Sequence, residues 1–237
     1  MSVIFFSATL TPYEYYRNVL IGKDTDFVRH FALSSPFPPE NLEVMIETDI
    51  STTYKERMFT MPKVCDRILE ELKGRSGNYM MFFPSFDYLN KVSKMIEEKA
   101  AVAIKLVIQR PGLTSKEKEE FLENFNEPYD GILLGGAVLG GHFGEGIDLV
   151  GDKLKGVIIV GVGIPQISPE REILSNYYSE KFGDGYAFAY RFPGWEKVLQ
   201  AVGRVIRTET DEGFALLIDD RLEKSEYLIL YPDNWQI

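Results

Sequence analysis

The sequence predicts an α/β protein built on a mostly parallel β-sheet with helices on both of its faces. Short apolar runs alternate with amphipathic helical segments along most of the chain, a rhythm typical of parallel strands joined by helical crossovers. Residues 79–83 are apolar throughout, as expected of a strand that is buried on both sides. A length of 237 residues with 45% hydrophobic content is enough for one large core, with at most a small appendage.

The N-terminal part is predicted to contain two strands and a helix. Residues 2–6 form an apolar β run directly after the first methionine. A buried strand with no lead-in suggests that the sequence is a piece of a longer polypeptide. Thr11 and Pro12 predict a helix that reaches residue 21, with threonine as its cap and proline at its first position. Residues 27–33 are predicted to be the second strand.

A connector follows. The stretch from Ser34 to Glu40 contains three prolines and two serines, so it is not expected to form regular structure. We therefore predict a boundary here, with residues 1–34 as the tail of one domain and a connector, and residues 35–237 as a second domain.

Beyond the connector the chain keeps its α/β rhythm. The predicted strands are residues 42–48, 79–83, 103–108, 131–134, 156–161 and 214–218. The predicted helices are residues 53–73, 86–99, 114–125, 168–182 and 195–207, followed by a turn at 219–221 and a short C-terminal helix. Ligands of such sheets bind beyond the carboxyl ends of the strands.

Composition narrows the classes of function. With 26 basic and 36 acidic residues the net charge is −10, which argues against a free-standing nucleic-acid binder that works by bulk electrostatics but leaves room for a local basic groove. The single cysteine, Cys65, rules out a disulfide within the chain and is predicted to be a half-buried helical residue; no Cys/His cluster suggests a metal site. No apolar stretch is long enough for a membrane span and no signal peptide is visible, so we expect a cytoplasmic protein.

One predicted helix carries a cluster of arginines. At about 100° per residue, its polar side presents Gln200, Gly203, Arg204 and Arg207. The core side holds Trp195, Val198, Leu199, Val202, Val205 and Ile206. Two forked guanidinium groups and an amide suit a multiply charged anion such as a nucleotide phosphate, and the glycine permits close approach. The alternative is an ordinary amphipathic surface helix with solvated arginines.

A glycine-rich stretch, residues 135–148, follows a predicted strand and contains six of the 20 glycines. Glycine at this density allows backbone amides to point at an anion or allows a strand edge to be remodelled. The carboxylates of Glu145 and Asp148 suit ribose hydroxyls, a bound water or a partner arginine. The alternative is a flexible loop with a solvated carboxylate pair, and His142 is not predicted to be a general base.

The stretch from Phe82 to Phe86 passes from a strand to a helix through Pro-Ser. This places the Ser85 hydroxyl and helix N-terminal amides at the carboxyl edge of the sheet, where a backbone phosphate could bind. Phe86 and Tyr88 are candidates for stacking on bases. The alternative is a serine N-cap with core aromatics, and Phe82 and Phe83 are predicted to lie in the core.

No GxxxxGK[ST] phosphate-binding loop is present, and Gly22-Lys23-Asp24 does not qualify. The chain thus has an arginine helix suited to a phosphate but no phosphate cradle of its own.

Taken together and in order, these stretches resemble the second motor domain of superfamily-two DNA helicases of the XPD/DinG family. The stretches that match the family's motifs III, IV, V and VI are Ser7-Ala8-Thr9-Leu10, Phe82-Phe83-Pro84-Ser85, Gly144-Glu145-Gly146-Ile147-Asp148 and Gln200 to Arg207. Residues 35–41 and 217–222 also read like that family. The resemblance covers nearly the whole chain.

The resemblance implies a RecA-like three-layer α/β/α fold. It also implies a motor of two such domains with ATP and Mg²⁺ between them, held mainly by the N-terminal domain that carries the phosphate-binding loop. Residues 1–34 would then be the tail of the first helicase domain, and residues 35–237 the complete second one. An iron–sulfur cluster, found in the first domain of many members, cannot be ligated here by one cysteine.

The resemblance also implies roles for individual residues. Arg204 and Arg207 would reach the γ-phosphate as arginine fingers, and Gln200 would bind the phosphate or order the attacking water. Gly144, Glu145, Gly146 and Asp148 would approach the nucleotide. Contacts to single-stranded DNA would come from Ser85, Phe86, Gly141 and His142, whereas Ser7 and Thr9 would couple hydrolysis to domain movement in the 5′ to 3′ direction usual for the family.

Two rival functions stay open at this point. One is a RecA-like module that binds nucleic acid or protein without an ATPase role, although it would not need the arginine face. The other is the motor half of an RNA helicase or translocase, which would carry similar arginines. Because the phosphate-binding lysine and the metal ligand are missing, we expect the isolated chain to hydrolyse little or no ATP.

Overall fold

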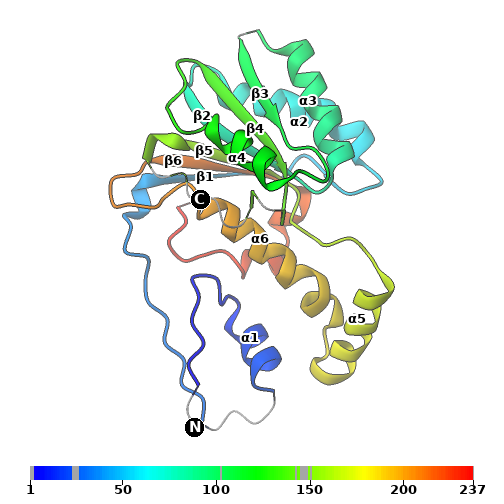
Figure 1. Cartoon of the computed structure of the whole chain (residues 1–237). Helices are drawn as coiled ribbons and strands as arrows, with labels where there is room; N and C mark the ends of the chain where they lie inside the picture. Colours follow the sequence, from blue (N-terminus) through cyan, green and yellow to red (C-terminus); the bar gives the residue numbers. More distant parts are fainter. Residues whose placement is uncertain are drawn as a thin grey trace.

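The computed structural model describes residues 3–22, 27–101, 103–141, 143–144, 149 and 151–236. Its centre is a six-stranded sheet, parallel at every pairing, in the order β1-β6-β5-β2-β4-β3 (Figure 1). The prediction of a mostly parallel sheet is confirmed. The strands are β1 (Leu42–Glu47), β2 (Gly77–Phe83), β3 (Ile104–Ile108), β4 (Ile132–Val138), β5 (Gly156–Val160) and β6 (Gly213–Ile218).

Helices cover both faces of the sheet. Alternate residues of a strand point to opposite faces, so in β2 Met81 and Phe83 belong to one core cluster and Met80 and Phe82 to the other. The first cluster is closed by α2 (Arg57–Leu72) and α3 (Phe86–Lys99), and the second by α4 (Ser115–Glu123) and α6 (Phe192–Val202). These are the three layers that the resemblance implies.

Local capping explains where several helices begin. The side chain of Ser85 accepts a hydrogen bond from the backbone of Tyr88 at the start of α3, and Thr114 forms a capping box with Glu117 in α4. Ser168 caps α5. The remaining elements are α1 (Tyr13–Leu20), η1 (Pro39–Asn41), η2 (Gly151–Lys153), α5 (Pro169–Phe182), the π-helix η3 (Ala187–Arg191), η4 (Asp220–Glu223) and α7 (Ser225–Leu228).

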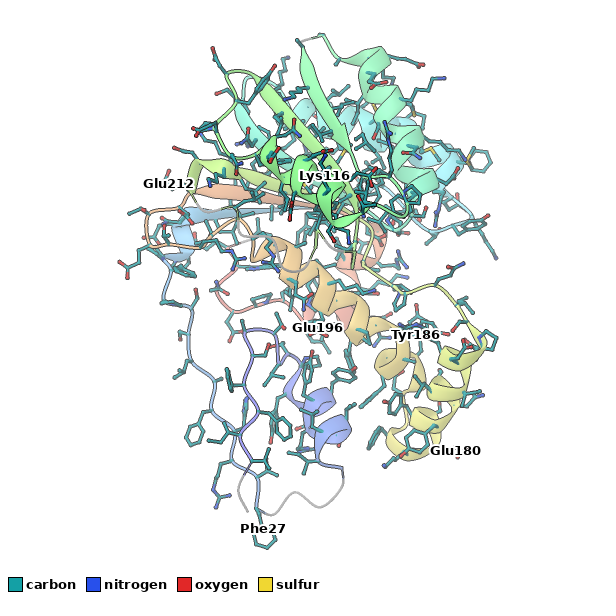
Figure 2. All side chains as sticks on the ribbon, in the orientation of Figure 1. Phe27, Lys116, Glu180, Tyr186, Glu196 and Glu212 are labelled. Carbon is teal, nitrogen blue, oxygen red and sulfur yellow. The ribbon has the colours of Figure 1, made fainter. Side chains whose placement is uncertain are left out.

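The N-terminal segment, defined as residues 3–22 and 27–34, differs from the prediction. The apolar runs 3–6 and 27–33 are largely exposed and form no strand in the described part of this segment. The helix starts at Tyr13, with Pro12 rather than Thr11 as its N-cap. The segment lies on the far side of α6 from the sheet, and Phe27 points away from the domain (Figures 1 and 2). Without a neighbouring strand, these runs have no ladder to join.

The fourth strand is longer than predicted, because Gly135 and Gly136 lie inside β4. A Cβ on Gly135 would sit 2.5 Å from the sulfur of Met80 and 2.5 Å from the Phe125 ring, and one on Gly136 would sit 2.7 Å from Leu89. These glycines therefore let helices and strand pack closely. They do not belong to the loop for anion binding to which the sequence pattern assigned them.

The arginine helix is shorter at its C-terminus than predicted and starts earlier, since α6 spans Phe192–Val202. Arg204 and Arg207 lie just beyond its end, although the core side is buried as expected at Trp195, Val198 and Val202. The α6 start is fixed by a backbone contact: a Cβ on Gly163, after β5, would lie 2.2 Å from the carbonyl oxygen of Gly194.

Two smaller points complete the fold. Cys65 lies in α2 as predicted, but it is fully buried rather than half-buried. Among the described residues, no helix combines the length and the hydropathy that a membrane crossing requires.

Candidate functional site

Residues that follow the strands gather at the carboxyl edge of the sheet, where ligands of such folds bind. Ser85 follows β2, Leu139 follows β4, Gly163 follows β5 and Asp219 follows β6. The parallel pairing brings these ends to one edge. The predicted site residues after β2 and β4 are therefore neighbours, as the sequence pattern indicated.

Asp219 is fully buried at this edge, and its carboxylate is saturated by hydrogen bonds. Arg221 donates to it from its backbone N–H, Nε and Nη2, each at 2.8 Å, and the Thr52 hydroxyl donates as well. Because its acceptor sites are occupied, Asp219 holds the segment after β6 in place. The sequence pattern predicted only that Asp219 lies in a turn.

A cavity of about 360 Å³ opens at the same edge, beside Pro84, which directly follows β2. Two of its lining side chains are cationic, Arg171 from the first turn of α5 and Lys197 from α6. Lys197 lies across Gly140, where a Cβ would be 2.6 Å from the lysine Cδ. The full lining is Pro84, Leu139, Gly163, Ile164, Pro165, Gln166, Ser168, Arg171 and Lys197. An acidic chain thus carries a local basic cavity.

Neither of these cations was a predicted site residue. Arg171 also donates from Nη1 to the Ala189 carbonyl at 3.0 Å, which ties α5 to η3. The available signal was the position of Lys197, three residues before Gln200 and therefore on a neighbouring part of the α6 surface. The sequence offered nothing comparable for Arg171.

The aromatic residues around the end of β2 differ in their burial. Ser85 is half-buried, and its Oγ accepts from the Tyr88 backbone at 3.3 Å, while the hydroxyl proton stays available for another acceptor. Phe86 is half-buried, so part of its ring faces solvent. Tyr88 is fully buried against Phe83, and the prediction that it stacks on bases is wrong. Phe82 and Phe83 lie in the core as predicted.

The glycine-rich stretch is described only in part. Gly141 donates its N–H to Val138 at 3.1 Å, and Gly144 donates to Gly141 at 3.0 Å. These two amides close tight turns after β4 and do not point at an anion. His142 and residues 145–148, which include the predicted Glu145, Gly146 and Asp148, lie outside the described residues.

The arginine segment, residues 200–207, continues α6 through tighter turns. Arg204 donates its N–H to Ala201 at 3.2 Å, and Val205 donates to Val202 at 3.1 Å, so the hydrogen bonds change from i→i−4 to i→i−3 spacing. Gln200 stays in the last turn of α6, and within the described structure its buried Oε1 accepts no hydrogen bond. Arg204 and Arg207 are both partly exposed.

Asp211 fixes the backbone just after this segment. Its carboxylate accepts from the N–H groups of Arg207 at 2.6 Å and Thr208 at 2.8 Å, and from the Thr208 hydroxyl at 2.6 Å. Burial favours a higher pKa for Asp211, but hydrogen bonds from Thr208, Arg207 and Gly151 outweigh it and hold the pKa below its usual value. The backbone from which the Arg207 side chain extends is therefore held in place by the buried, charged carboxylate of Asp211.

The predicted coupling residues reach α6 from the N-terminal segment. The hydroxyls of Ser7 and Thr9 lie 3.3 Å apart, and Thr9 Oγ1 donates to Glu196 Oε1 at 3.4 Å. Ser7 is exposed, whereas Thr9 is half-buried. One of the two predicted residues thus contacts the arginine helix directly.

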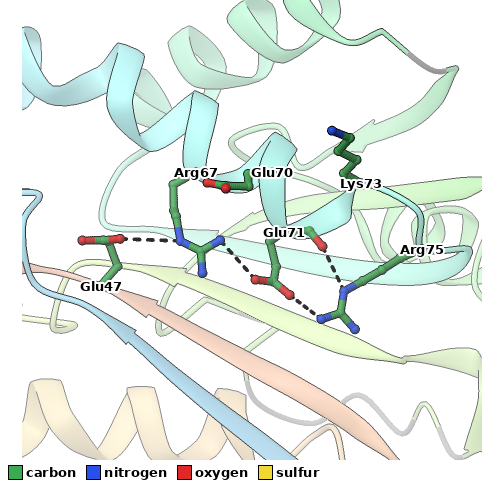
Figure 3. Close-up of a pocket in the computed structure, with 6 residues that line it drawn as sticks. All are labelled: Glu47, Arg67, Glu70, Glu71, Lys73 and Arg75. Carbon is green, nitrogen blue, oxygen red and sulfur yellow. Dashed lines mark hydrogen bonds and ion pairs between the residues drawn. The ribbon is translucent and has the colours of Figure 1, made fainter.

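A second cavity, about 600 Å³, lies against α2 and is lined by Glu47, Arg67, Glu70, Glu71, Lys73 and Arg75 (Figure 3). Buried Glu71 pairs with Arg67 at 3.1 Å and with Arg75 at 2.5 Å. Three acidic and three basic side chains compensate one another, so the cavity favours no anion. Within the described part of the chain, no cluster of three or more His, Cys, Asp or Glu side chains could hold a metal ion.

The model of one family, the helicase C-terminal domain, matches residues 68–236. The chain belongs to this family. The match includes β2, all the residues that line the 360 Å³ cavity, and the whole arginine segment. The predicted identity as the C-terminal domain of an XPD/DinG-type helicase, with its RecA-like fold, is confirmed.

Individual proteins are similar over most of the chain. The ATP-dependent DNA helicase DinG of Photobacterium profundum is 28% identical over 230 residues, which are 94% of this chain and 32% of that protein. The 3′-5′ exonuclease DinG of Bacillus subtilis is 28% identical over 242 residues, 98% of this chain and 25% of that protein. The chain thus spans about a quarter to a third of the length of these relatives.

Solved structures share the fold. XPD_Helicase aligns with a TM-score of 0.69 at 21% identity, over 96% of this chain and 40% of that one. XPD_APO aligns with a TM-score of 0.70 at 22% identity, over 93% of this chain and 44% of that one.

Proposed function

We propose that this chain is the C-terminal half of an ATP-dependent DNA helicase and supplies arginine fingers to ATP bound by the N-terminal domain of the same polypeptide. The observation that carries the proposal is the arginine segment, in which Arg207 follows α6 on a backbone held by the buried carboxylate of Asp211. Such anchoring orients a guanidinium group before the reaction and lowers the cost of ordering it in the transition state.

The chemistry assigned to this segment is phosphoryl transfer to water. Arg204 and Arg207 stabilise the charge that develops on the γ-phosphate, and Mg²⁺ would be held by the N-terminal domain. Gln200 has a buried Oε1 that accepts no hydrogen bond within the described structure, which suits an acceptor for the attacking water. In this proposal Gly144, Glu145, Gly146 and Asp148 approach the nucleotide from the loop after β4.

Single-stranded DNA is the proposed partner at the carboxyl edge. The cavity beside Pro84 offers two cations, Arg171 and Lys197, to a backbone phosphate. Phe86 is placed to stack on a base, and Gly141 and His142 belong to the same edge in this proposal. Local cations of this kind reconcile DNA binding with a net charge of −10.

The N-terminal helicase domain is the proposed partner of the N-terminal segment. Residues 3–6 and 27–33 expose large apolar side chains, and such surfaces are typical of interfaces. Ser7 and Thr9 then lie between the two domains, where ATP-dependent closure would be passed on to DNA.

The test compares DNA-stimulated ATP hydrolysis of the full-length polypeptide, intact and with Arg207→Ala. We expect turnover to fall by about 10³- to 10⁵-fold with nucleotide binding largely kept, because an arginine finger acts on the transition state. Lys94→Ala is the control, since Lys94 is an exposed cation on α3, in the layer opposite α6, where it pairs with Glu98 at 3.9 Å. An unchanged rate for Arg207→Ala would contradict the proposal.

Two further arms sharpen this test. The isolated chain should hydrolyse little or no ATP, because it has no phosphate-binding lysine; robust turnover would refute the division of labour between domains. Comparing single-stranded DNA with RNA as the stimulator separates a DNA helicase from an RNA motor. Stronger stimulation by RNA would overturn the assignment of DNA as the partner.

A further inference from the structure

Helix α1 packs against the start of α6 through aromatic rings. The Tyr15 ring lies 5.4 Å from Phe188 and 5.2 Å from Phe192, measured between ring centroids. Burial raises the pKa of Tyr15 to about 12, so its hydroxyl is neutral at physiological pH. The N-terminal segment is therefore held to η3 and α6 by a defined apolar contact.

Beside this contact, Glu196 receives two hydroxyl groups from the same segment. Its Oε1 accepts from Thr9 Oγ1 at 3.4 Å, and the phenol of Tyr16 lies beside the same carboxylate. Burial, and then the hydrogen bond to Glu196, raise the pKa of Tyr16, which keeps the phenol protonated as a donor. Figure 2 shows Glu196 on the side of α6 that faces the N-terminal segment.

Glu196 is also placed to influence the arginine segment. It precedes Gln200 by four residues within α6, so the two side chains lie one turn apart on the same face of the helix. Arg204 follows through the tightened turn at the end of α6. A change at the carboxylate that tilts α6 therefore moves the groups assigned to the γ-phosphate.

We propose that Glu196 is a positioning residue that couples the N-terminal segment to the arginine segment. This inference rests on the proposed helicase function and adds the α6 end of the coupling contact. Thr9 and Tyr16 hold the carboxylate, and α6 carries the displacement to Gln200 and Arg204. Glu196 itself touches neither nucleotide nor DNA.

The experiment uses the full-length polypeptide with Glu196→Ala, Glu196→Gln and Tyr16→Phe. The readouts are the ratio of DNA-stimulated to basal ATPase rate, the base pairs unwound per ATP, and the KM for ATP. We expect the stimulation ratio to fall by roughly 2- to 30-fold in Glu196→Ala and Tyr16→Phe, the range that coupling residues show. The KM for ATP and the thermal midpoint should stay close to those of the intact protein.

The three variants also test the mechanism of coupling. Glu196→Gln keeps an oxygen acceptor for both hydroxyls and should retain most of the stimulation. Glu196→Ala combined with Tyr16→Phe should be no worse than Glu196→Ala alone, because both substitutions remove the same contact.

A second tyrosine–glutamate pair, which joins η3 and α5, provides the matched control. In this pair, Tyr190 donates to Glu172 Oε1 at 2.5 Å. Glu172→Ala and Tyr190→Phe should leave the stimulation ratio unchanged. An equal loss in this pair, or full coupling in Glu196→Ala and Tyr16→Phe, would overturn the inference.

The outcomes separate this inference from the proposed function. If Arg207→Ala abolishes hydrolysis while Glu196→Ala couples normally, only the role of Glu196 is refuted. If Arg207→Ala hydrolyses ATP normally, the proposed function is refuted and the role of Glu196 falls with it.

Discussion

Two apolar runs of this chain have similar sequences and opposite environments. Val3, Ile4, Phe5 and Phe6 have exposed fractions of 60%, 84%, 51% and 91%. Met80, Met81, Phe82 and Phe83, which form the second half of β2, are each 0% exposed. The difference lies in their neighbours.

Strand β2 pairs with β4 on one side and β5 on the other, and helices cover both of its faces. The run 3–6 lies beyond α6, and its segment reaches the domain through Thr9, Tyr15 and Tyr16. Apolar sequence therefore predicts which residues can be buried, whereas the available partners decide which ones are. Three experiments test this contrast, in decreasing order of expected effect.

The largest effect is expected from truncating the same aromatic residue in each run. Phe82→Ala should lower the free energy of unfolding of the isolated chain by about 3–5 kcal/mol, because it removes a fully buried ring and leaves a cavity. Phe6→Ala should change it by less than about 0.5 kcal/mol, since that ring is already in solvent. Urea unfolding measures both. A cost above about 1 kcal/mol for Phe6→Ala would show that the run contributes to the core of this domain.

A smaller effect is expected from adding atoms to each region. Gly136→Ala places a methyl group 2.7 Å from Leu89 and 2.8 Å from Ile108, and such overpacking costs about 1–3 kcal/mol. Ala32→Val, in the exposed part of the N-terminal segment, adds two carbon atoms where nothing has to move and should be neutral within about 0.5 kcal/mol. Thermal unfolding of both variants compares them. A neutral Gly136→Ala would mean that β4 can yield to a side chain.

The smallest effect is expected from polar groups. Asp211→Asn keeps the shape but removes the charge that three or more donors share, and should cost about 1–2 kcal/mol at pH 7. Because the folded pKa is below the unfolded one, the stabilisation is present at neutral pH and is lost as pH falls below the ordinary aspartate pKa. Unfolding measured from pH 7 to pH 3 should show this loss in the intact chain.

In the same titration, the Asp211→Asn variant should show a weaker decline towards low pH. Ser7→Ala, which removes an exposed hydroxyl that bonds to Thr9 within the same turn, should match the intact chain throughout. Parallel pH curves for the intact and Asp211→Asn proteins would argue that the carboxylate of Asp211 does not stabilise the fold.

The sequence was sufficient wherever local signals and burial agreed. Helix α3 has the predicted bounds, because Ser85 is an effective N-cap and an apolar face follows it. Strand β4 was predicted too short because Gly135 and Gly136 resemble a loop in sequence, whereas their packing against Phe125 and Leu89 is visible only in three dimensions. The strand predictions for residues 3–6 and 27–33 were wrong for the opposite reason, because an apolar pattern does not show whether a neighbouring strand is present.

The candidate site was predictable as motifs but not as contacts. The order of the motifs located Ser85 and the arginine segment. Phe82 and Phe83 were correctly predicted in the core, the Ser85 cap was one of two alternatives, and the burial of Tyr88 was missed. Asp211 was missed although its partners Arg207 and Thr208 lie only three to four residues away. Lys197 and Arg171 were missed because their contacts are made with residues distant in the chain, Gly140 for Lys197 and Ala189 for Arg171. Glu196 likewise acquires meaning only through Tyr16 and Thr9.

The contact between Gly163 and Gly194 provides a pivot point near the start of α6. The backbone of the loop after β5 touches the backbone at the start of the helix there, so that end has little freedom to slide. The 11 residues of α6 span about 16 Å at a rise of 1.5 Å per residue. Gly194 is the third of these residues, so the part of α6 from Gly194 to Val202 is about 12 Å long, and a tilt of about 5° around this contact would displace Val202 by about 1 Å. Because hydrogen-bond lengths vary by only a few tenths of an ångström, a displacement of this size is enough to make or break hydrogen bonds of the residues that follow α6.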